Sequence, residues 1–170
     1  MDSQSARMLA RYNAWANRLL FDAVAALPPG ETTRQRQTLF QTMIGTLNHN
    51  YVIDLIWQAH LEGRDHGFQA RNLVPHPGLP SLWTAQQAID AWYVTWSEAQ
   101  SDASLNEELP FTFIGGEKSA MTRGDMLLHI INHTSYHRGW VAEMFHQIPV
   151  KPPTTDLPVY LARMRKAKAA

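Results

Sequence analysis

The sequence predicts an all-α protein, a four-helix bundle in a single domain over residues 1–170, with a small hairpin before the last helix. Four long stretches repeat apolar residues at three- and four-residue steps, as the buried face of an α-helix requires. Proline and glycine interrupt this pattern between the stretches. A chain of 170 residues is also long enough to bury a sizeable core in one domain. Together these observations favour a bundle of four helices.

The first two helices are expected at about Ser5–Leu27 and Thr38–His60. The Pro28–Gly30 segment ends the first of them, because proline and glycine break a helical pattern. The second is apolar over more than half its circumference, which is typical of a helix contacted on several sides. His49 lies on one flank of this helix beyond Gly45, and the helical wheel leaves open whether it is a ligand.

The middle of the chain is less regular. Residues 62–81 are rich in glycine and proline and predict a long loop, which in a compact domain is usually functional or a crossing connection. A third helix is expected at about Thr84–Ala103. The alternating run Pro110–Lys118, with its Gly-Gly turn, predicts a short hairpin. After the last helix, the prolines from Pro149 to Pro158 predict an extended C-terminal strap.

The last long helix carries the histidines that first indicate a function. Thr122 and Asp125 form a capping-box pattern at its start. His129, His133 and His137 then follow at successive i, i+4 steps, so on a helix all three point to roughly one side. This is a spacing that metal ligands use.

Of these histidines, His133 and His137 lie within the apolar arc of the helix and are expected to face the core, whereas His129 lies at its edge. A buried imidazole without partners costs about 1 to 3 kcal/mol for each bare nitrogen. Two imidazoles one turn apart can instead direct lone pairs at one cation. We favour this over hydrogen bonds to hydroxyls or waters for the inward pair, and a structural role for His129. At most one of His49 and His60 can join the site, because about 16 Å of helix separates them.

Composition excludes several functions. The formal net charge is zero, so no overall field would draw the chain to nucleic acid or to anionic lipid. There is no cysteine, so any metal must be held by nitrogen and oxygen atoms. No apolar run approaches the roughly 20 residues of a membrane span, and the polar start lacks the apolar segment of a signal peptide. We therefore expect neither a nucleic acid nor a membrane as partner, and a cytoplasmic location.

Several segments carry a family pattern when taken in this order and spacing: Tyr12–Asn17, Gly45–His49, Leu128–Gly139, Pro152–Pro153 and Asp156–Leu161. With them, nearly the whole chain resembles the DinB-like (YfiT-like) family of proposed metalloenzymes. The resemblance implies a four-helix bundle, often dimeric, with a divalent metal held by three histidines that correspond here to His49, His133 and His137. It agrees with the helical wheel in setting His129 aside. Trp140 departs from the pattern, because the family often has glutamine there.

Three histidines on a divalent ion, expected to be zinc or nickel, leave a coordination position open, which is the catalytic arrangement for zinc. Relatives in the resembling family include low-molecular-weight-thiol S-transferases and a thiol-dependent maleylpyruvate isomerase. The resemblance therefore implies a metal-dependent S-transferase that takes a small thiol and an electrophilic substrate, in a homodimer. Its catalytic residues are not assigned. Arg138 lies opposite the core arc and is expected at the surface or at an interface.

Other functions stay open. A metal-dependent hydrolase has less support, because neither Asp54 nor Glu143 shares the flank of the histidines to act as a base. A non-catalytic, stress-related metal-binding or oligomeric module is a further alternative. A ferritin-like di-iron bundle would need paired Glu-x-x-His motifs. Only Glu143–His146 fits that motif, and it points away from the core arc, so we reject this alternative.

Overall fold

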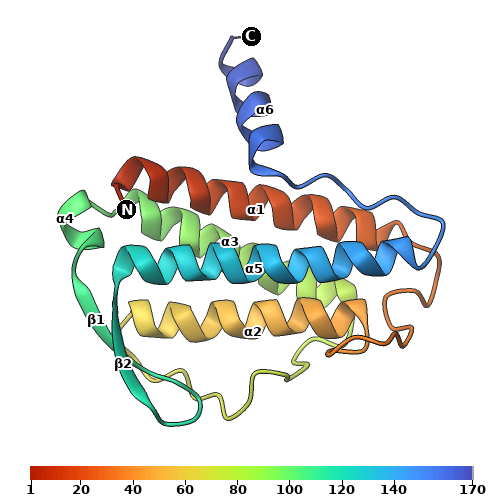
Figure 1. Ribbon diagram of the computed structural model, residues 1–170, viewed down its shortest axis with the longest axis horizontal. Coiled ribbons are helices and arrows are strands. Elements are labelled where there is room, and N and C mark those ends of the chain that lie inside the picture. Colours follow the sequence, from red (N-terminus) through yellow and green to blue (C-terminus); the bar gives the residue numbers. More distant parts are fainter. Residues whose placement is uncertain (170) are drawn as a thin grey trace.

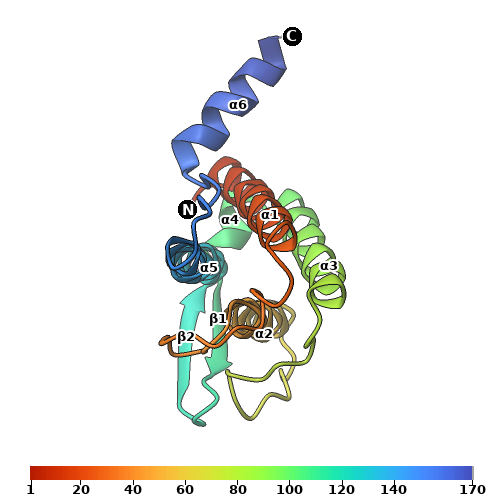
Figure 2. The same ribbon diagram turned by 90° about the vertical axis from the view of Figure 1, so that its right-hand side faces the viewer.

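Four long helices lie side by side and form the predicted bundle in the computed structural model, which describes residues 1–169 (Figure 1). They are α1 (Ser3–Ala25), α2 (Met43–Leu61), α3 (Leu79–Glu98) and α5 (Arg123–His146). Figure 2 looks along the bundle: α1 packs against α3 and α5, and α2 packs against the same two helices. The all-α fold class is confirmed. The helix α5 therefore has α1 on one side and α2 on another.

Hydroxyl and carboxylate side chains set where three of these helices begin. Asp2 accepts a hydrogen bond from the backbone of Ser5 at 2.6 Å, and Thr122 accepts one from the backbone of Asp125 at 3.1 Å, so Thr122 is confirmed as the N-cap of α5. Thr42 caps α2 in the same way, which makes the predicted start at Thr38 too early. The segment before Thr42 cannot be helical, because Gln41 has a positive φ of 61°.

The third helix lies earlier than predicted. It begins at Leu79 with Pro80 in its first turn, where the missing N–H of proline costs no hydrogen bond. It ends at Glu98, and the chain then forms the separate short helix α4 (Asp102–Leu105), capped by Ser101. The predicted end at Ala103 joined two helices into one.

The predicted hairpin is present and lies across one end of α2 and α5. Its strands β1 (Glu108–Thr112) and β2 (Lys118–Thr122) pair antiparallel, with Glu108 opposite Thr122. Gly116 takes a φ of 88° in the turn, a conformation that glycine adopts without strain. Phe111 is buried and packs against Trp57 of α2 with ring centroids 5.0 Å apart. The hairpin thus covers one end of the space between α2 and α5.

The predicted C-terminal strap is wrong over its last part. Residues 151–156 are extended, but α6 spans Leu157–Ala169 and projects from the bundle (Figures 1 and 2). Pro158 lies in the first turn of α6, where it is compatible with a helix. Tyr160 anchors α6 on α1, with its ring 5.8 Å from Tyr12 and 5.4 Å from Trp15.

The core of the bundle is apolar, as the helical periodicity predicts. Met126, Ile130, Val141 and Met144, which form the predicted arc of α5, are each 0% exposed. In the part of the chain that the structure describes, no helix is both long and apolar enough to cross a membrane. Against this apolar background, two groups of buried polar side chains stand out, one on each side of α5.

Candidate metal centre

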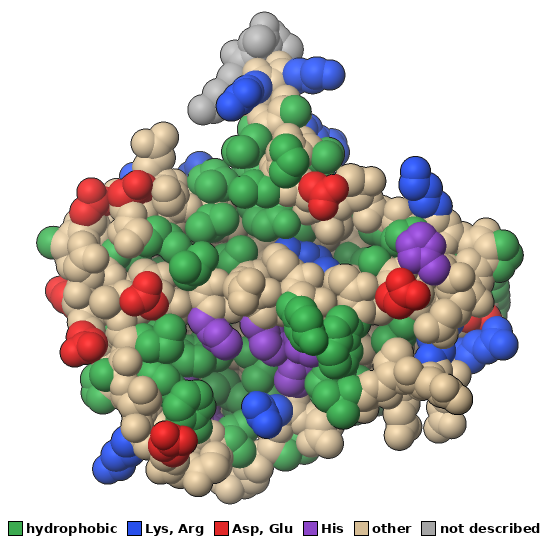
Figure 3. Space-filling view, viewed as in Figure 1, with side chains coloured by type: hydrophobic (Ala, Val, Ile, Leu, Met, Phe, Trp, Pro, Cys, Tyr) green, Lys and Arg blue, Asp and Glu red, His purple; other side chains and the backbone are tan. Residues whose placement is uncertain are grey.

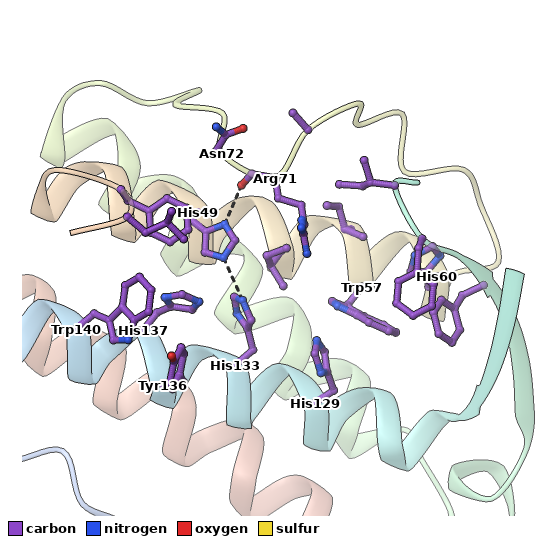
Figure 4. A pocket seen from close by; sticks show the side chains of 18 of the residues that line it. His49, Trp57, His60, Arg71, Asn72, His129, His133, Tyr136, His137 and Trp140 are labelled. Carbon is purple, nitrogen blue, oxygen red and sulfur yellow. Dashed lines mark hydrogen bonds between the residues drawn. The ribbon is translucent and has the colours of Figure 1, made fainter. Parts of the chain in front are cut away.

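Histidines from two helices converge between α2 and α5. His49 comes from α2, and His133 and His137 come from successive turns of α5 (Figure 4). Each offers a ring nitrogen, and these nitrogens lie within 4.8 Å of one another. The structure therefore brings together the three residues that the family resemblance singled out. His129 and His60 are not part of this cluster.

A backbone carbonyl fixes the orientation of His49. Its Nδ1 lies 2.8 Å from the carbonyl oxygen of Arg71, which can only accept, so Nδ1 carries the hydrogen. Its Nε2 is then a bare lone pair, and it faces Nε2 of His133 at 3.1 Å. A carbonyl that holds the other nitrogen of an imidazole is the usual arrangement behind a metal-binding histidine.

Gly45 lets the preceding loop cover His49. A Cβ atom at Gly45 would overlap with the carbonyl oxygen of Phe40. The space beside this helix position is thus taken by loop backbone and not by another helix. The Phe40 ring stacks on His49 with centroids 4.2 Å apart. The glycine therefore allows an aromatic wall to form beside the cluster.

The other two histidines have buried ring nitrogens without a partner. In the described part of the chain, Nδ1 of His133 and Nδ1 of His137 are buried and accept or donate no hydrogen bond. Burial, together with the smaller effect of the neighbouring histidines, lowers the pKa of His133 to about 3 and that of His137 to about 4. Burial also lowers the pKa of His49. All three imidazoles are neutral at pH 7, as ligands must be.

This donor set fits a divalent cation. Neutral imidazoles suit zinc, nickel and other first-row metals, and three of them leave at least one coordination position free. A cation between the rings would also separate the facing nitrogens of His49 and His133, whose lone pairs otherwise repel unless one is protonated. The chemistry of the residues thus agrees with a metal site, and the identity of the metal is left open by it.

The cluster opens into a cavity of about 750 Å³. Figure 3 shows histidines in a hollow of the surface with hydrophobic side chains around them. His129 and His60 line this cavity away from the cluster. Trp57 lies between them, with its ring centroid 4.7 Å from that of His129 and 5.3 Å from that of His60. Trp140, where the family pattern often has glutamine, contributes an aromatic wall 4.8 Å from His137.

On the opposite side of α5, Arg138 is buried, so its expected surface position is wrong. It is 3% exposed because α1 packs over this face of α5. One of its nitrogens, Nη1, donates to Asn13 Oδ1 at 2.6 Å and to Asn17 Oδ1 at 2.9 Å, and Nη2 donates to Ser135 Oγ at 2.8 Å. The apolar periodicity of α5 could not reveal this, because the partners lie more than 100 residues earlier in two of these bonds.

Two buried carboxyls continue this network, which we call the arginine network (Asn13, Asn17, Asp54, Gln86, Asp90, Ser135 and Arg138). Gln86 donates to Asp54 at 2.9 Å and to Asp90 at 3.1 Å, and Asn17 donates to Asp90 at 2.9 Å. Burial raises the pKa of Asp54 to about 8 and that of Asp90 to about 6. At pH 7 one ionised carboxyl then balances one guanidinium. Asp54 does not line the histidine cavity, as the helical wheel predicts.

The fold and the site together define the class of protein: an all-helical bundle with three neutral histidines at the floor of an open cavity. The sequence profile of the DinB family matches residues 1–167, and the chain belongs to this family. The similarity to the DinB-like family that the sequence motifs indicate is thereby confirmed.

Two known proteins are similar to this chain. Protein DinB of Bacillus subtilis (strain 168) is 26% identical over 175 residues, which cover 98% of this chain and 99% of that protein. The crystal structure of a DinB-like protein from Bacillus cereus ATCC 10987 superposes with a TM-score of 0.61 at 16% identity. That superposition covers 85% of this chain and 91% of the other and supports the fold.

Sequence reasoning missed two residues of this site. Phe40 lies in the segment that was assigned to the second helix, and its role as a wall depends on the loop there. Arg71 lies in the irregular loop 62–78, and its carbonyl and its side chain both reach the site. A loop of this length was expected to be either functional or a crossing connection, which is the one signal that pointed to it.

Proposed function

We propose that this protein is a metal-dependent transferase that joins a low-molecular-weight thiol to an electrophilic substrate, with the metal held by His49, His133 and His137. The observation that carries the proposal is the convergence of three neutral imidazoles within 4.8 Å at the floor of a cavity. A bound divalent ion would supply Lewis acidity there and lower the pKa of a thiol or water.

The reaction is a substitution. The thiol gives its proton to water, and its sulfur attacks the electrophilic carbon; the S–C bond forms while the leaving group departs with the bonding electrons. The contribution of the chain is to bind and orient. Phe40 and Trp140 wall the histidines with aromatic rings, which excludes water from one side of the cluster.

A hydrolase has less support than a transferase. None of the residues that line the cavity, all within the described part of the chain, is an aspartate or a glutamate. Glu143 is exposed, and Asp54 is buried in the arginine network. A carboxylate positioned to activate water, as many metal-dependent hydrolases use, is therefore not provided by these side chains.

Metal analysis of protein purified without a histidine tag tests the site. The wild type and His129→Ala are expected to retain about one zinc or nickel ion per chain, whereas His133→Ala loses it. The His129→Ala variant is the matched control, because it removes an imidazole one turn away in the same cavity. Equal metal loss in both variants contradicts the assignment.

A conjugation assay separates an enzyme from a non-catalytic metal-binding module. The metal-loaded wild type is incubated with a small thiol and an alkyl halide, and thioether is measured by mass spectrometry. We expect turnover by the wild type and His129→Ala and only the uncatalysed rate with His133→Ala. A metal-loaded protein without turnover across a panel of thiols and halides would favour the non-catalytic module.

We also propose that the protein is a homodimer, as the family resemblance implies. The projecting helix α6 supports this, because it extends from the bundle beyond its anchor at Tyr160. Sedimentation velocity is expected to give the mass of two chains, about twice the 19.3 kDa of one. A single species of one chain at high concentration contradicts the proposal.

A further inference from the structure

Arg71 is the one Lys, Arg, Asp or Glu among the residues that line the histidine cavity. Figure 4 shows its side chain reaching from the loop into the space between the cluster and Trp57. Within the described part of the chain, no ion pair includes Arg71, although five other arginines have a carboxylate partner. The cavity thus presents a single positive charge without a partner beside an otherwise uncharged wall.

The loop that carries Arg71 is tied to α2 next to the histidine cluster. The carbonyl of Arg71 accepts from Nδ1 of His49 at 2.8 Å. The adjacent residue, Asn48, donates to the carbonyl of His76 at 2.8 Å and accepts from its backbone N–H at 3.0 Å. The backbone of Arg71 is therefore held at a defined distance from the cluster, which is what a binding group needs.

Large apolar side chains make up much of the rest of the cavity wall. Trp57 and Phe111 pack against each other at one end, with ring centroids 5.0 Å apart. Leu39, Phe113 and Tyr136 stand at the rim, 74%, 47% and 59% exposed. Large hydrophobic side chains exposed around a hollow are typical of a surface that binds an apolar ligand.

We propose that the cavity selects a small organic molecule with one carboxylate, bound by Arg71, and an apolar body, preferably aromatic, that lies along Trp57 and Phe113. This proposal rests on the transferase function, because it places the reactive end of the bound molecule at the histidine cluster. The carboxylate belongs either to the thiol or to the electrophile. Arginine suits a carboxylate because its planar fork offers two parallel hydrogen bonds.

Equilibrium binding tests the recognition without any turnover. Phenylpropanoate and its neutral isostere phenylpropanamide are titrated calorimetrically into the wild type, Arg71→Leu, Arg71→Lys and Arg64→Leu. The wild type is expected to bind the acid about tenfold more tightly than the amide, and Arg71→Leu to lose this preference. Arg71→Lys keeps part of it, because the charge remains but the fork does not. The Arg64→Leu control removes a cation that lies on the same loop but outside this cavity and keeps the full preference.

A separate variant tests whether the apolar part of the ligand lies along Phe113. Phe113 is half-exposed on the hairpin, so Phe113→Ala is expected to fold normally. It should weaken binding of phenylpropanoate about fivefold while leaving the acid-over-amide ratio unchanged. An unchanged affinity in Phe113→Ala, or an acid-over-amide ratio near one in the wild type, overturns the inference.

Turnover measurements then locate the carboxylate. Mercaptopropanoate and mercaptopropanamide are compared with a neutral halide, and bromomethylbenzoate and bromomethylbenzamide with a neutral thiol. We expect Arg71→Leu to raise KM about tenfold for whichever acid member carries the natural carboxylate, with kcat little changed. An Arg71→Leu variant with unchanged KM for both acids overturns the inference.

The two proposals fail separately. Binding of phenylpropanoate is also measured with His133→Ala, in which the metal site is removed but Arg71 remains. If His133→Ala still prefers the acid and the wild type shows no turnover, the proposed carboxylate recognition is supported and the transferase function is refuted. If the wild type turns over and Arg71→Leu has an unchanged KM, the transferase function is supported and the proposed carboxylate recognition is refuted.

Discussion

The histidine cluster and the arginine network lie on opposite sides of α5 and differ in how their polar atoms are satisfied. In the arginine network, each charged group has partners: Arg138 donates three hydrogen bonds, and Gln86 connects Asp54 with Asp90. In the cluster, Nδ1 of His133 and Nδ1 of His137 are buried without a partner. Both groups are polar and largely buried, but only in the arginine network do the charged groups all have hydrogen-bond partners.

This difference separates a structural role from a binding role. Buried polar groups in native proteins are almost always hydrogen-bonded, so an unsatisfied one needs an explanation. The arginine network joins α1, α2, α3 and α5 and needs no further ligand. The cluster joins only α2 and α5 and borders a cavity. A ligand in the cluster would be held where Nε2 of His49 faces Nε2 of His133 at 3.1 Å, whereas the arginine network finds its partners within the chain.

The largest expected effect is on the arginine network. Arg138→Met leaves the buried carboxyls without their cation, and we expect a loss of about 3–5 kcal/mol in the free energy of unfolding. Arg11→Met is the matched control: its ion pair with Glu98 is exposed, with side chains 53% and 49% accessible, and should cost less than about 1 kcal/mol. Urea denaturation measures both. Equal losses would show that the network is not what holds these helices together.

A bound metal should stabilise the folded protein only through the histidine cluster. At a free zinc or nickel concentration about 100 times its Kd, the free energy of unfolding is expected to rise by about 2.7 kcal/mol. Thermal or urea denaturation of metal-free and metal-loaded wild type measures this rise. His133→Leu should show none of it, while Arg11→Met should show all of it. A rise that survives in His133→Leu would place the metal elsewhere.

Without metal, the histidine cluster should lower the free energy of unfolding. His133→Leu removes a buried nitrogen that lacks a partner, so we expect the metal-free protein to gain about 1 kcal/mol. The comparison is Asn17→Leu in the arginine network, which should be destabilising because it breaks bonds to Arg138 and Asp90. Urea denaturation in the presence of a chelator gives both values. A loss of stability in His133→Leu would mean that the contact of Nε2 of His133 with Nε2 of His49 at 3.1 Å outweighs the cost of the unpartnered Nδ1.

The two sites also predict opposite slopes of stability with pH in the metal-free protein. His133 titrates near 3 when folded and near 6.5 when unfolded, so its contribution is present above pH 6.5 and is lost as pH falls. Asp54 titrates near 8 when folded and near 3.8 when unfolded, so its contribution is present at low pH and is lost as pH rises through 8.

Denaturation of variants at several pH values checks these signs. His133→Leu should flatten the stability profile between about pH 3 and 6.5, and Asp54→Asn should remove the fall in stability between about pH 4 and 8. The substitutions act on different sides of α5 and serve as controls for each other. If Asp54→Asn left the slope between about pH 4 and 8 unchanged, Asp54 would be ionised in the native state and the charge balance with Arg138 would be wrong.

The helices and two of the three cluster histidines were open to prediction because they depend on local spacing. Apolar residues at helical steps predicted the four long helices, and the i, i+4 spacing placed His133 beside His137. His49 came only through the family resemblance, since no local pattern says which residue of α2 faces α5. The ends of α2 and α3 were missed, because a cap is set by one side chain and a turn by a few dihedral angles.

By itself the sequence determined the bundle, its buried arcs and the pair of histidines on α5, since helical periodicity follows from the chain alone. Only the tertiary structure decided that α1 covers Arg138, that loop 62–78 brings Arg71 over His49, and that Phe40 stacks on that imidazole. Each of these contacts joins side chains from separate segments. Which face of a helix meets which partner is settled by packing of the whole bundle, and that packing is not encoded in any short stretch.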